Sequence, residues 1–326
     1  MNTIDYVYRF DPENPSTKPP PPDAEAARKN LEDGNRMFSR WMSSCQTSTL
    51  TAGTEPKHVV QCNSLEVGMV RKQGGTPKQA PFAVVVGCSD ARVPTEMIFG
   101  QGFNDLFVIR VAGNVLGDVC HGSLDFAVNA LSESLKVLVV LGHSGCGAVT
   151  GAVDAYLRPL DFWSKNTTPA LRTILQKIFV SVCEAANCLE EVWGPEARQM
   201  PGYRDSLIET SVALNAAQAA LALRQVVEIS GRREIEVYYG VYNLNNHQVS
   251  MPNDPNQPSS DQNVNLALAP SNPRDFHTLG LKMAEILKSS ADRPRSSDPV
   301  AAQGPVASGP NPVNGDGPPR ARPDAP

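Results

Sequence analysis

The sequence lacks an excess of positive charge, a long apolar run and an apolar leader. Its 326 residues carry 29 lysines and arginines against 34 aspartates and glutamates, a formal net charge of -5. This balance offers no basic surface to a phosphate backbone. No run approaches the roughly 20 apolar residues that span a bilayer, and residues 1–15 are polar and acidic, unlike a signal peptide. We therefore expect a cytoplasmic protein that binds neither nucleic acid nor a membrane.

The sequence also lacks the even, dense set of cysteines that a disulfide framework needs. Its seven cysteines are spread along a chain long enough to bury a core without cross-links. In a reducing compartment, a cysteine near a histidine is more often a metal ligand or a catalytic residue. Cys183 and Cys188 fall in a helical pattern, so we expect them to be packing residues, and we expect His277 to lie on the surface.

Proline and small polar residues dominate both ends of the chain. The first 22 residues end in four consecutive prolines, which disfavour a helix or a central strand. From residue 289 onward, hardly any large apolar side chain is present to offset the entropy of ordering. We therefore predict a disordered arm at 1–22, one folded catalytic domain at 23–288 and a disordered tail at 289–326.

Apolar runs alternate with helical patterns between these ends. Residues 82–87, 106–111 and 136–142 are short and uniformly apolar, which is typical of parallel strands buried on both faces. Residues 234–242 form a further strand that turns back through 243–247 as an antiparallel edge. Helices are predicted at 23–43, 64–73, 96–99, 122–134, 145–157, 168–193, 206–229 and 273–288. The fold class is α/β, with a mostly parallel central sheet flanked by helices and an N-terminal helical arm.

Two glycine-containing loops follow two of these apolar runs. They read Gly87-Cys88-Ser89-Asp90-Ala91-Arg92-Val93 and Gly142-His143-Ser144-Gly145-Cys146-Gly147. In open α/β sheets, ligands bind at the carboxyl ends of the parallel strands. The two loops should therefore bring two thiols, an imidazole, a carboxylate and a guanidinium to one edge of the sheet.

Cys88, His143 and Cys146 are of the residue types that zinc prefers. Thiolate and imidazole bind zinc at about 2.0 to 2.3 Å in tetrahedral sites, and three protein ligands leave one position open for chemistry. A carboxylate beside a metal with two thiolates would be repelled, whereas an ion pair with Arg92 would orient Asp90 and keep it ionised. The alternatives are a buried structural thiol at Cys88 and a purely structural ion pair.

These loops resemble the paired motifs of the β-class carbonic anhydrases. The resemblance covers about residues 23–250 and includes Arg110-Val111-Ala112-Gly113-Asn114 and Gly122-Ser123-Leu124-Asp125-Phe126-Ala127 between the loops. It implies zinc held by Cys88, His143 and Cys146. The fourth position is taken by water in the active form, or by Asp90 in a closed form in which its pair with Arg92 is broken.

The resemblance also implies a reaction and an assembly. The reaction is the reversible hydration of carbon dioxide to bicarbonate and a proton, by a zinc-bound hydroxide that Asp90 and Arg92 orient. The assembly is a homodimer or larger homo-oligomer, in which the early helix packs on the partner subunit. The resemblance assigns the substrate contacts to Gln79, Phe107 and Gly147. Two other functions stay open: hydrolysis of carbonyl sulfide or carbon disulfide at the same site, and a non-enzymatic zinc-stabilised scaffold.

Overall fold

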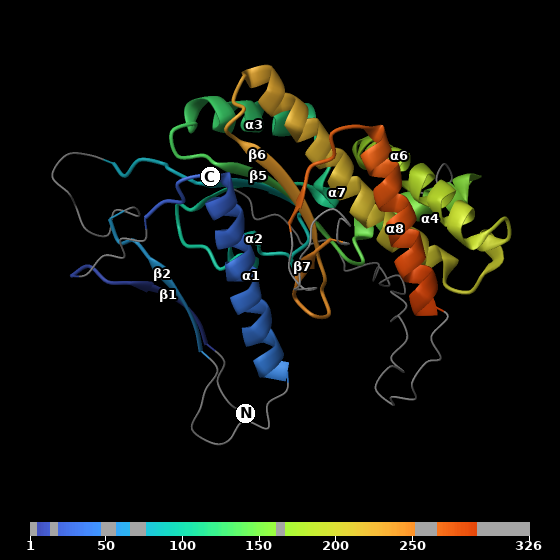
Figure 1. Ribbon diagram of the computed structural model, residues 1–326, viewed down its shortest axis with the longest axis horizontal. Helices are drawn as coiled ribbons and strands as arrows, with labels where there is room; N and C mark the ends of the chain where they lie inside the picture. Colours follow the sequence, from blue (N-terminus) through green and yellow to red (C-terminus); the bar gives the residue numbers. More distant parts are fainter. Residues whose placement is uncertain are drawn as a thin grey trace, which may run out of the picture. The chain divides into compact units, whose positions relative to one another are not determined.

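The computed structural model describes residues 5–13, 19–46, 57–65, 76–160, 167–251 and 266–291. Their centre is a sheet in which four parallel strands follow the order β4-β3-β5-β6. Figure 1 shows β5 and β6 of this sheet side by side. Antiparallel β7 and β8 both pair with β6. The strands are β3 (Ala83–Gly87), β4 (Leu106–Arg110), β5 (Val137–His143), β6 (Glu236–Tyr242), β7 (Val249–Ser250) and β8 (Ala267–Leu268). The predicted parallel sheet and its antiparallel edge are confirmed.

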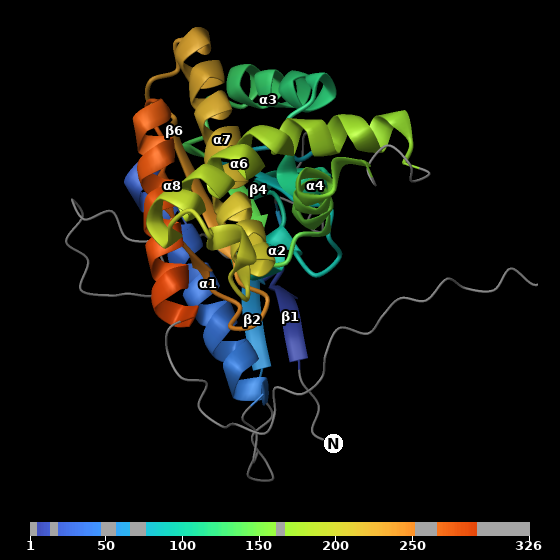
Figure 2. The same cartoon turned by 90° about the vertical axis from the view of Figure 1, so that its right-hand side faces the viewer.

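Helices cover both faces of this sheet, which explains why its central strands are apolar throughout. Val84 and Val86 of β3 pack into one core with the helices α3, α4, α6, α7 and α8. Ala83 and Val85 of the same strand pack into a second core with α1 and α2. The helices are α1 (Ala24–Gln46), α2 (Thr95–Ile98), α3 (Asp118–Ala130), α4 (Gly147–Leu157), α6 (Pro169–Trp193), α7 (Tyr203–Ser230) and α8 (Pro273–Ala291). Figure 2 shows the larger helical layer with α6, α7 and α8 side by side.

The length and composition of α7 would let it cross a membrane, but 72% of its most apolar window is buried inside the protein. It contacts β5, β6, α6 and α8. Alanines such as Ala216 and Ala217, both fully buried, let it lie close to the sheet. This burial is that of a core helix.

The expected disordered arm at 1–22 is wrong for residues 5–10. They form β1 (Asp5–Phe10), which pairs in parallel with β2 (Lys57–Cys62), a strand that the sequence did not reveal. These residues are ordered as a strand because aromatic side chains alternate along β1. The rings of Tyr8 and Phe10 lie 5.5 and 5.6 Å from that of Phe103, so the strand is held by side-chain packing rather than by a larger sheet.

Several other boundaries differ from the predictions. Helix α3 begins at Asp118, four residues early, because Gly122 lies inside the helix instead of starting it. Most of the helix predicted at 64–73, and the tail from 292 onward, lie outside the described residues.

The helix α1 buries an apolar side against its own chain, while its packing on a partner subunit stays a prediction. Ala27 and Leu31 are fully buried, and Phe38 is nearly so. Asn35 donates hydrogen bonds from Nδ2 to the carbonyl oxygens of Ile98 and His247, each at 3.1 Å. The helix is thus fixed to both the α2 region and the turn after β6.

Candidate metal centre

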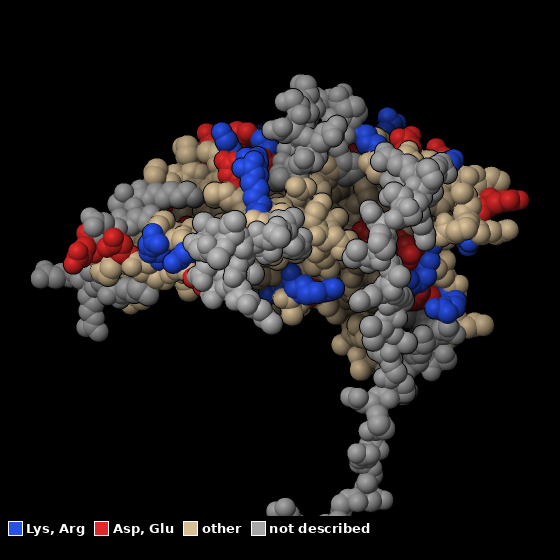
Figure 3. Space-filling model, turned by 90° about the horizontal axis from the view of Figure 1, so that it is seen from below, with Lys and Arg blue, Asp and Glu red and all other residues tan. Residues whose placement is uncertain are grey.

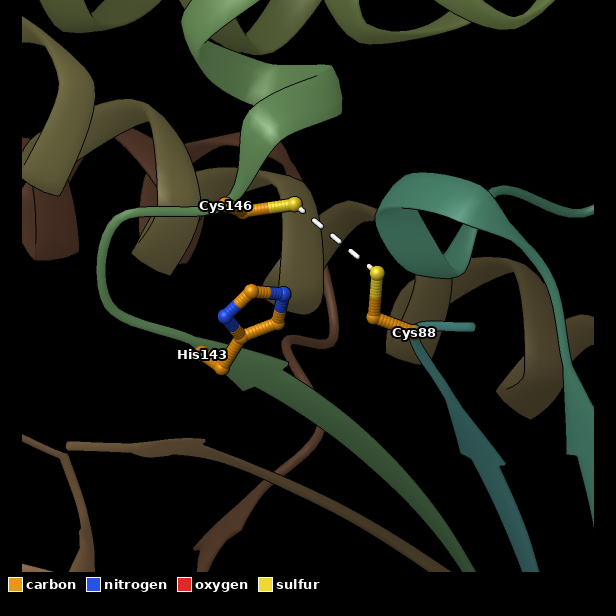
Figure 4. A group of neighbouring side chains, drawn as sticks. All are labelled: Cys88, His143 and Cys146. Carbon is orange, nitrogen blue, oxygen red and sulfur yellow. Dashed lines mark hydrogen bonds between the residues drawn. The ribbon is translucent and has the colours of Figure 1, made fainter. Parts of the chain in front are cut away.

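The carboxyl ends of β3 and β5 bring three potential metal ligands together. Cys88 directly follows β3, His143 is the last residue of β5, and Cys146 immediately precedes α4. Their ligand atoms lie within 4.8 Å of one another, and all three residues are buried. Figure 4 shows the side chains converging from the two loops, with the two sulfurs 4.0 Å apart. The predicted meeting of the two loops is confirmed.

The His143 ring presents a bare nitrogen to this cluster. Its Nδ1 lies 3.0 Å from the carbonyl oxygen of Ser144, which can only accept a hydrogen bond, so Nδ1 carries the proton. In a neutral ring this leaves a lone pair on Nε2, a buried atom that has no hydrogen-bond partner among the described residues. Buried polar atoms are rarely left unpaired. A neutral imidazole with an unpaired lone pair is the form in which histidine binds a metal.

The thiols of Cys88 and Cys146 differ in their pKa values. The Cys146 thiol hydrogen-bonds to the Cys88 sulfur, and this bond lowers the pKa of Cys88 and raises the pKa of Cys146. The Gly113 amide also donates to the Cys88 sulfur at 3.3 Å. The cluster therefore stabilises one thiolate, and the thiolate is the form of cysteine that binds zinc.

Asp90 and Arg92 form the predicted two-point ion pair at the edge of the cluster. Arg92 Nε donates to Oδ1 of Asp90 at 3.0 Å, and Nη2 donates to Oδ2 at 2.7 Å. These bonds hold the pKa of Asp90 well below its usual range. Asp90 Oδ2 also lies 3.8 Å from Nε2 of His143. The structure thus places an ionised carboxylate beside the cluster, turned toward its arginine.

Residues outside the two loops hold them in place. Arg110 donates from Nε to the Cys88 carbonyl oxygen at 3.0 Å and from Nη2 to the Asp90 carbonyl oxygen. Glu209 on α7 accepts a hydrogen bond at 3.0 Å from the amide of Gly145, whose φ of 61° favours glycine. Asn215, also on α7, donates to the Gly113 carbonyl oxygen at 2.8 Å. No local sequence pattern marks Glu209 or Asn215, because both are ordinary polar positions of a long helix.

The structure places only one of the three predicted substrate contacts beside this cluster. Gly147 adjoins Cys146 at the start of α4. Gln79 is exposed in the loop before β3, at the opposite end of the strand from Cys88. Five strand residues separate these ends, a distance of about 16 Å at 3.3 Å per residue. Phe107 lies in register with Val84, early in its strand, with its ring 6.3 Å from that of Phe126.

Comparison with known proteins links this centre to one family. The family model described as carbonic anhydrase matches residues 83–249, a stretch that contains both loops. A carbonic anhydrase of Mycolicibacterium smegmatis is 41% identical over 130 residues, which are 40% of this chain and 53% of the relative. Carbonic anhydrase 2 of Mycobacterium tuberculosis is 39% identical over 130 residues, with the same two coverages. The chain therefore spans about half the length of the curated relatives it matches.

Among solved structures, a Coccomyxa β-carbonic anhydrase in complex with acetazolamide aligns with 68% of this chain and 83% of its own. It is 22% identical, with a TM-score of 0.41.

Proposed function

The chain belongs to the β-class carbonic anhydrase family, and from this membership we propose that it hydrates carbon dioxide reversibly to bicarbonate and a proton, with zinc as its cofactor. The observation that carries the proposal is the buried cluster of Cys88, His143 and Cys146, in which Nε2 of His143 has a lone pair and no partner among the described residues. Two thiols and a neutral imidazole are donors that suit zinc and leave a fourth position open.

Cys88, His143 and Cys146 would hold the metal. Zinc, when bound, supplies a Lewis acid that makes water at the open position acidic enough to become a nucleophile near neutral pH. Gly113 and Arg110 support this ligand set by donating hydrogen bonds to the sulfur and the carbonyl oxygen of Cys88.

Asp90 would orient the attacking oxygen rather than remove its proton. Because Arg92 binds both carboxylate oxygens and lowers the pKa of Asp90, the carboxylate is a weak base that still accepts a hydrogen bond. An accepted hydrogen bond would fix the attacking oxygen so that its lone pair faces the carbon of carbon dioxide. The proton then leaves to buffer.

The same pair would control access to the fourth position. Asp90 Oδ2 lies only 3.8 Å from Nε2 of His143, so a small rotation away from Arg92 would bring the carboxylate to the metal. We propose that this closed form excludes water and that the Arg92 ion pair opposes it.

A homodimer or larger homo-oligomer would complete the substrate pocket. Gln79 and Phe107 lie toward the amino ends of their strands, away from Cys88 of their own chain, so a partner subunit would have to supply these contacts. No disulfide joins any of the seven cysteines, all of which lie among the described residues, in keeping with the proposed cytoplasmic location. On the face shown in Figure 3, acidic and basic side chains of the described residues are interspersed.

The test is zinc content and carbon dioxide hydration, measured by mass spectrometry and stopped flow on the purified protein. We expect zinc and activity that both fall in Cys88→Ser and persist in Cys183→Ser, an exposed cysteine. A protein that binds zinc but is inactive at mildly alkaline pH would instead be a scaffold. Faster hydrolysis of carbonyl sulfide or carbon disulfide than hydration of carbon dioxide would assign the site to those substrates.

A further inference from the structure

A second cluster of potential metal ligands lies between α6 and α8. Glu184 and Cys188 come from α6, His277 comes from α8, and their ligand atoms lie within 4.8 Å of one another. The Cys188 sulfur is 3.7 Å from Nδ1 of His277 and 3.7 Å from Oε1 of Glu184. The same Oε1 lies 2.7 Å from Nδ1 of His277. This cluster shares no residue with the candidate metal centre.

We propose that Glu184, Cys188 and His277 form a second zinc site, which fastens the C-terminal helix α8 to α6. Zinc bound at about 2.3 Å to sulfur and about 2.0 to 2.1 Å to nitrogen and oxygen separates tetrahedral ligand atoms by roughly 3.3 to 3.6 Å. The two distances from the Cys188 sulfur, both 3.7 Å, exceed this range by about 0.1 Å. The His277 to Glu184 distance needs to open by less than about 1 Å, which side-chain rotation supplies.

The orientation of the His277 ring distinguishes a metal site from a catalytic triad. In a triad, the nucleophile and the carboxylate lie at opposite nitrogens of the imidazole. Here Cys188 and Glu184 both face Nδ1, where one ion can contact all three. Cys188 is also fully buried, so it is poorly placed to attack a substrate.

The other nitrogen of His277 faces a carboxylate. Nε2 lies 3.6 Å from Oε2 of Glu191, just beyond hydrogen-bond distance. Metal-binding histidines usually donate their second N–H to a carboxylate or carbonyl group, which fixes the ring. Glu184, Cys188 and Glu191 lie at helical spacing on one side of α6, so a single helix face supplies two ligands and the supporting carboxylate.

Close packing of the two helices keeps the ligands in place. A Cβ atom added at Gly280 of α8 would lie 2.5 Å from the Cys188 sulfur, so glycine is required for this approach. Trp193 Nε1 of α6 donates to the Ala284 carbonyl oxygen at 2.9 Å. The helix α8 also lies outside residues 83–249, which match the family model. The second site therefore depends on a segment beyond the matched stretch.

The experiment is zinc uptake by the full-length protein after removal of metal with a chelator. We expect two zinc ions per wild-type chain and one in His277→Gln. The replaced side chain is 43% exposed, so the fold should tolerate this change. Cys188→Ser should also bind one. The matched control is Cys183→Ser on the same helix, whose exposed thiol lies outside the cluster, and it should bind two.

A thermal shift isolates the second site from the first. In a Cys88→Ser background, zinc should raise Tm by several degrees, because a ligand that binds only the folded state stabilises it. Adding His277→Gln should abolish this shift. If Cys88→Ser binds no zinc, or if His277→Gln changes neither uptake nor the shift, the second site does not exist.

These outcomes separate the second site from the proposed function. One zinc per chain that is lost in Cys88→Ser and kept in His277→Gln overturns the second site and leaves the proposed function intact. One zinc that is lost in His277→Gln and kept in Cys88→Ser supports the second site and contradicts the first.

Discussion

Asn215 donates a hydrogen bond to the carbonyl oxygen of Gly113 at 2.8 Å, and the amide of Gly113 donates to the Cys88 sulfur at 3.3 Å. A side chain of α7 thus positions the backbone that contacts a proposed zinc ligand. Asn215 is almost fully buried, so its amide group is a fixed support for this loop rather than a surface group.

Replacement of Asn215 by alanine should destabilise the protein and weaken its hold on metal. The change leaves the Gly113 carbonyl without this buried donor, which costs about 1 to 3 kcal/mol of unfolding free energy. Urea unfolding and the rate of zinc loss to a chelator measure the two effects. The control is Asn129→Ala, where an exposed amide donates to the Asp125 carbonyl oxygen at the same 2.8 Å. Equal losses in both variants would contradict the supporting role.

Asp90→Asn should keep zinc and lose most activity. The amide retains the shape of the side chain but removes the charge that the Arg92 pair stabilises, so we expect kcat/KM to fall roughly 100-fold or more. Asp154→Asn is the matched control, because Arg204 binds Asp154 through the same two-point geometry, at 2.8 and 3.0 Å, away from the cluster. Normal carbon dioxide hydration by Asp90→Asn would remove Asp90 from the mechanism.

Arg92→Ala should also lower activity, and its effect should not add to that of Asp90→Asn. Without Arg92, the Asp90 carboxylate is free to turn toward the metal position. Its Oδ2 atom already lies 3.8 Å from Nε2 of His143. Residues that act as one unit show non-additive losses. The measurement is a double-mutant cycle on kcat/KM, and fully additive losses would show that Arg92 acts independently.

Gly34→Ala should be among the most damaging single-methyl changes in the chain. A Cβ atom there would lie 1.7 Å from the Phe99 carbonyl oxygen, so α1 would have to move off α2, at a cost of about 3 kcal/mol or more. Gly122→Ala is the control, because its Cβ meets nothing within 4 Å inside the helix α3. The Gly122→Ala variant should gain about 0.5 to 1 kcal/mol of unfolding free energy, because alanine favours a helix more than glycine does. Comparable urea midpoints for the two variants would contradict the close approach.

Glu32 should make stability depend on pH in a defined direction. Burial raises the pKa of Glu32 above its ordinary value, although Arg28 and the Leu266 amide both bind its carboxylate. A carboxyl group with a raised folded-state pKa contributes stability below its unfolded pKa of about 4.3, and this contribution is lost as pH rises through the folded value. Relative to Glu32→Gln, which does not titrate, the wild type should therefore lose unfolding free energy as pH rises from about 4.3 through the raised folded-state pKa. Urea unfolding at several pH values would reveal the opposite slope if the assignment is wrong.

The central sheet and both loops could be predicted because their signals are local. Uniformly apolar runs rich in valine mark β3 and β5, and glycine marks the turn that follows each of them. Strands that pair in parallel end at the same edge, so the meeting of Cys88 with His143 follows from the sequence.

The remaining features depend on contacts between distant segments. The strand β1 was missed because its pairing partner β2 lies far along the chain and neither strand is uniformly apolar. Cys188 was expected to be a packing residue, and it is buried, but its contact with His277 depends on how α8 crosses α6. The contacts that α1 makes with its own chain likewise depend on the positions of α2 and of the turn after β6, which the sequence does not give.

The parallel pairing of Gly87 with Leu141 sets an order of events during synthesis. Cys88 leaves the ribosome early, and it stays apart from His143 until β4, α3 and β5 have emerged and the two central strands have joined. Closing so long a connection is a slow step compared with local folding. A nascent chain from which β5 has not yet emerged therefore lacks two of the three proposed zinc ligands, and the pairing of β3 with β5 is what brings the full set to one edge of the sheet.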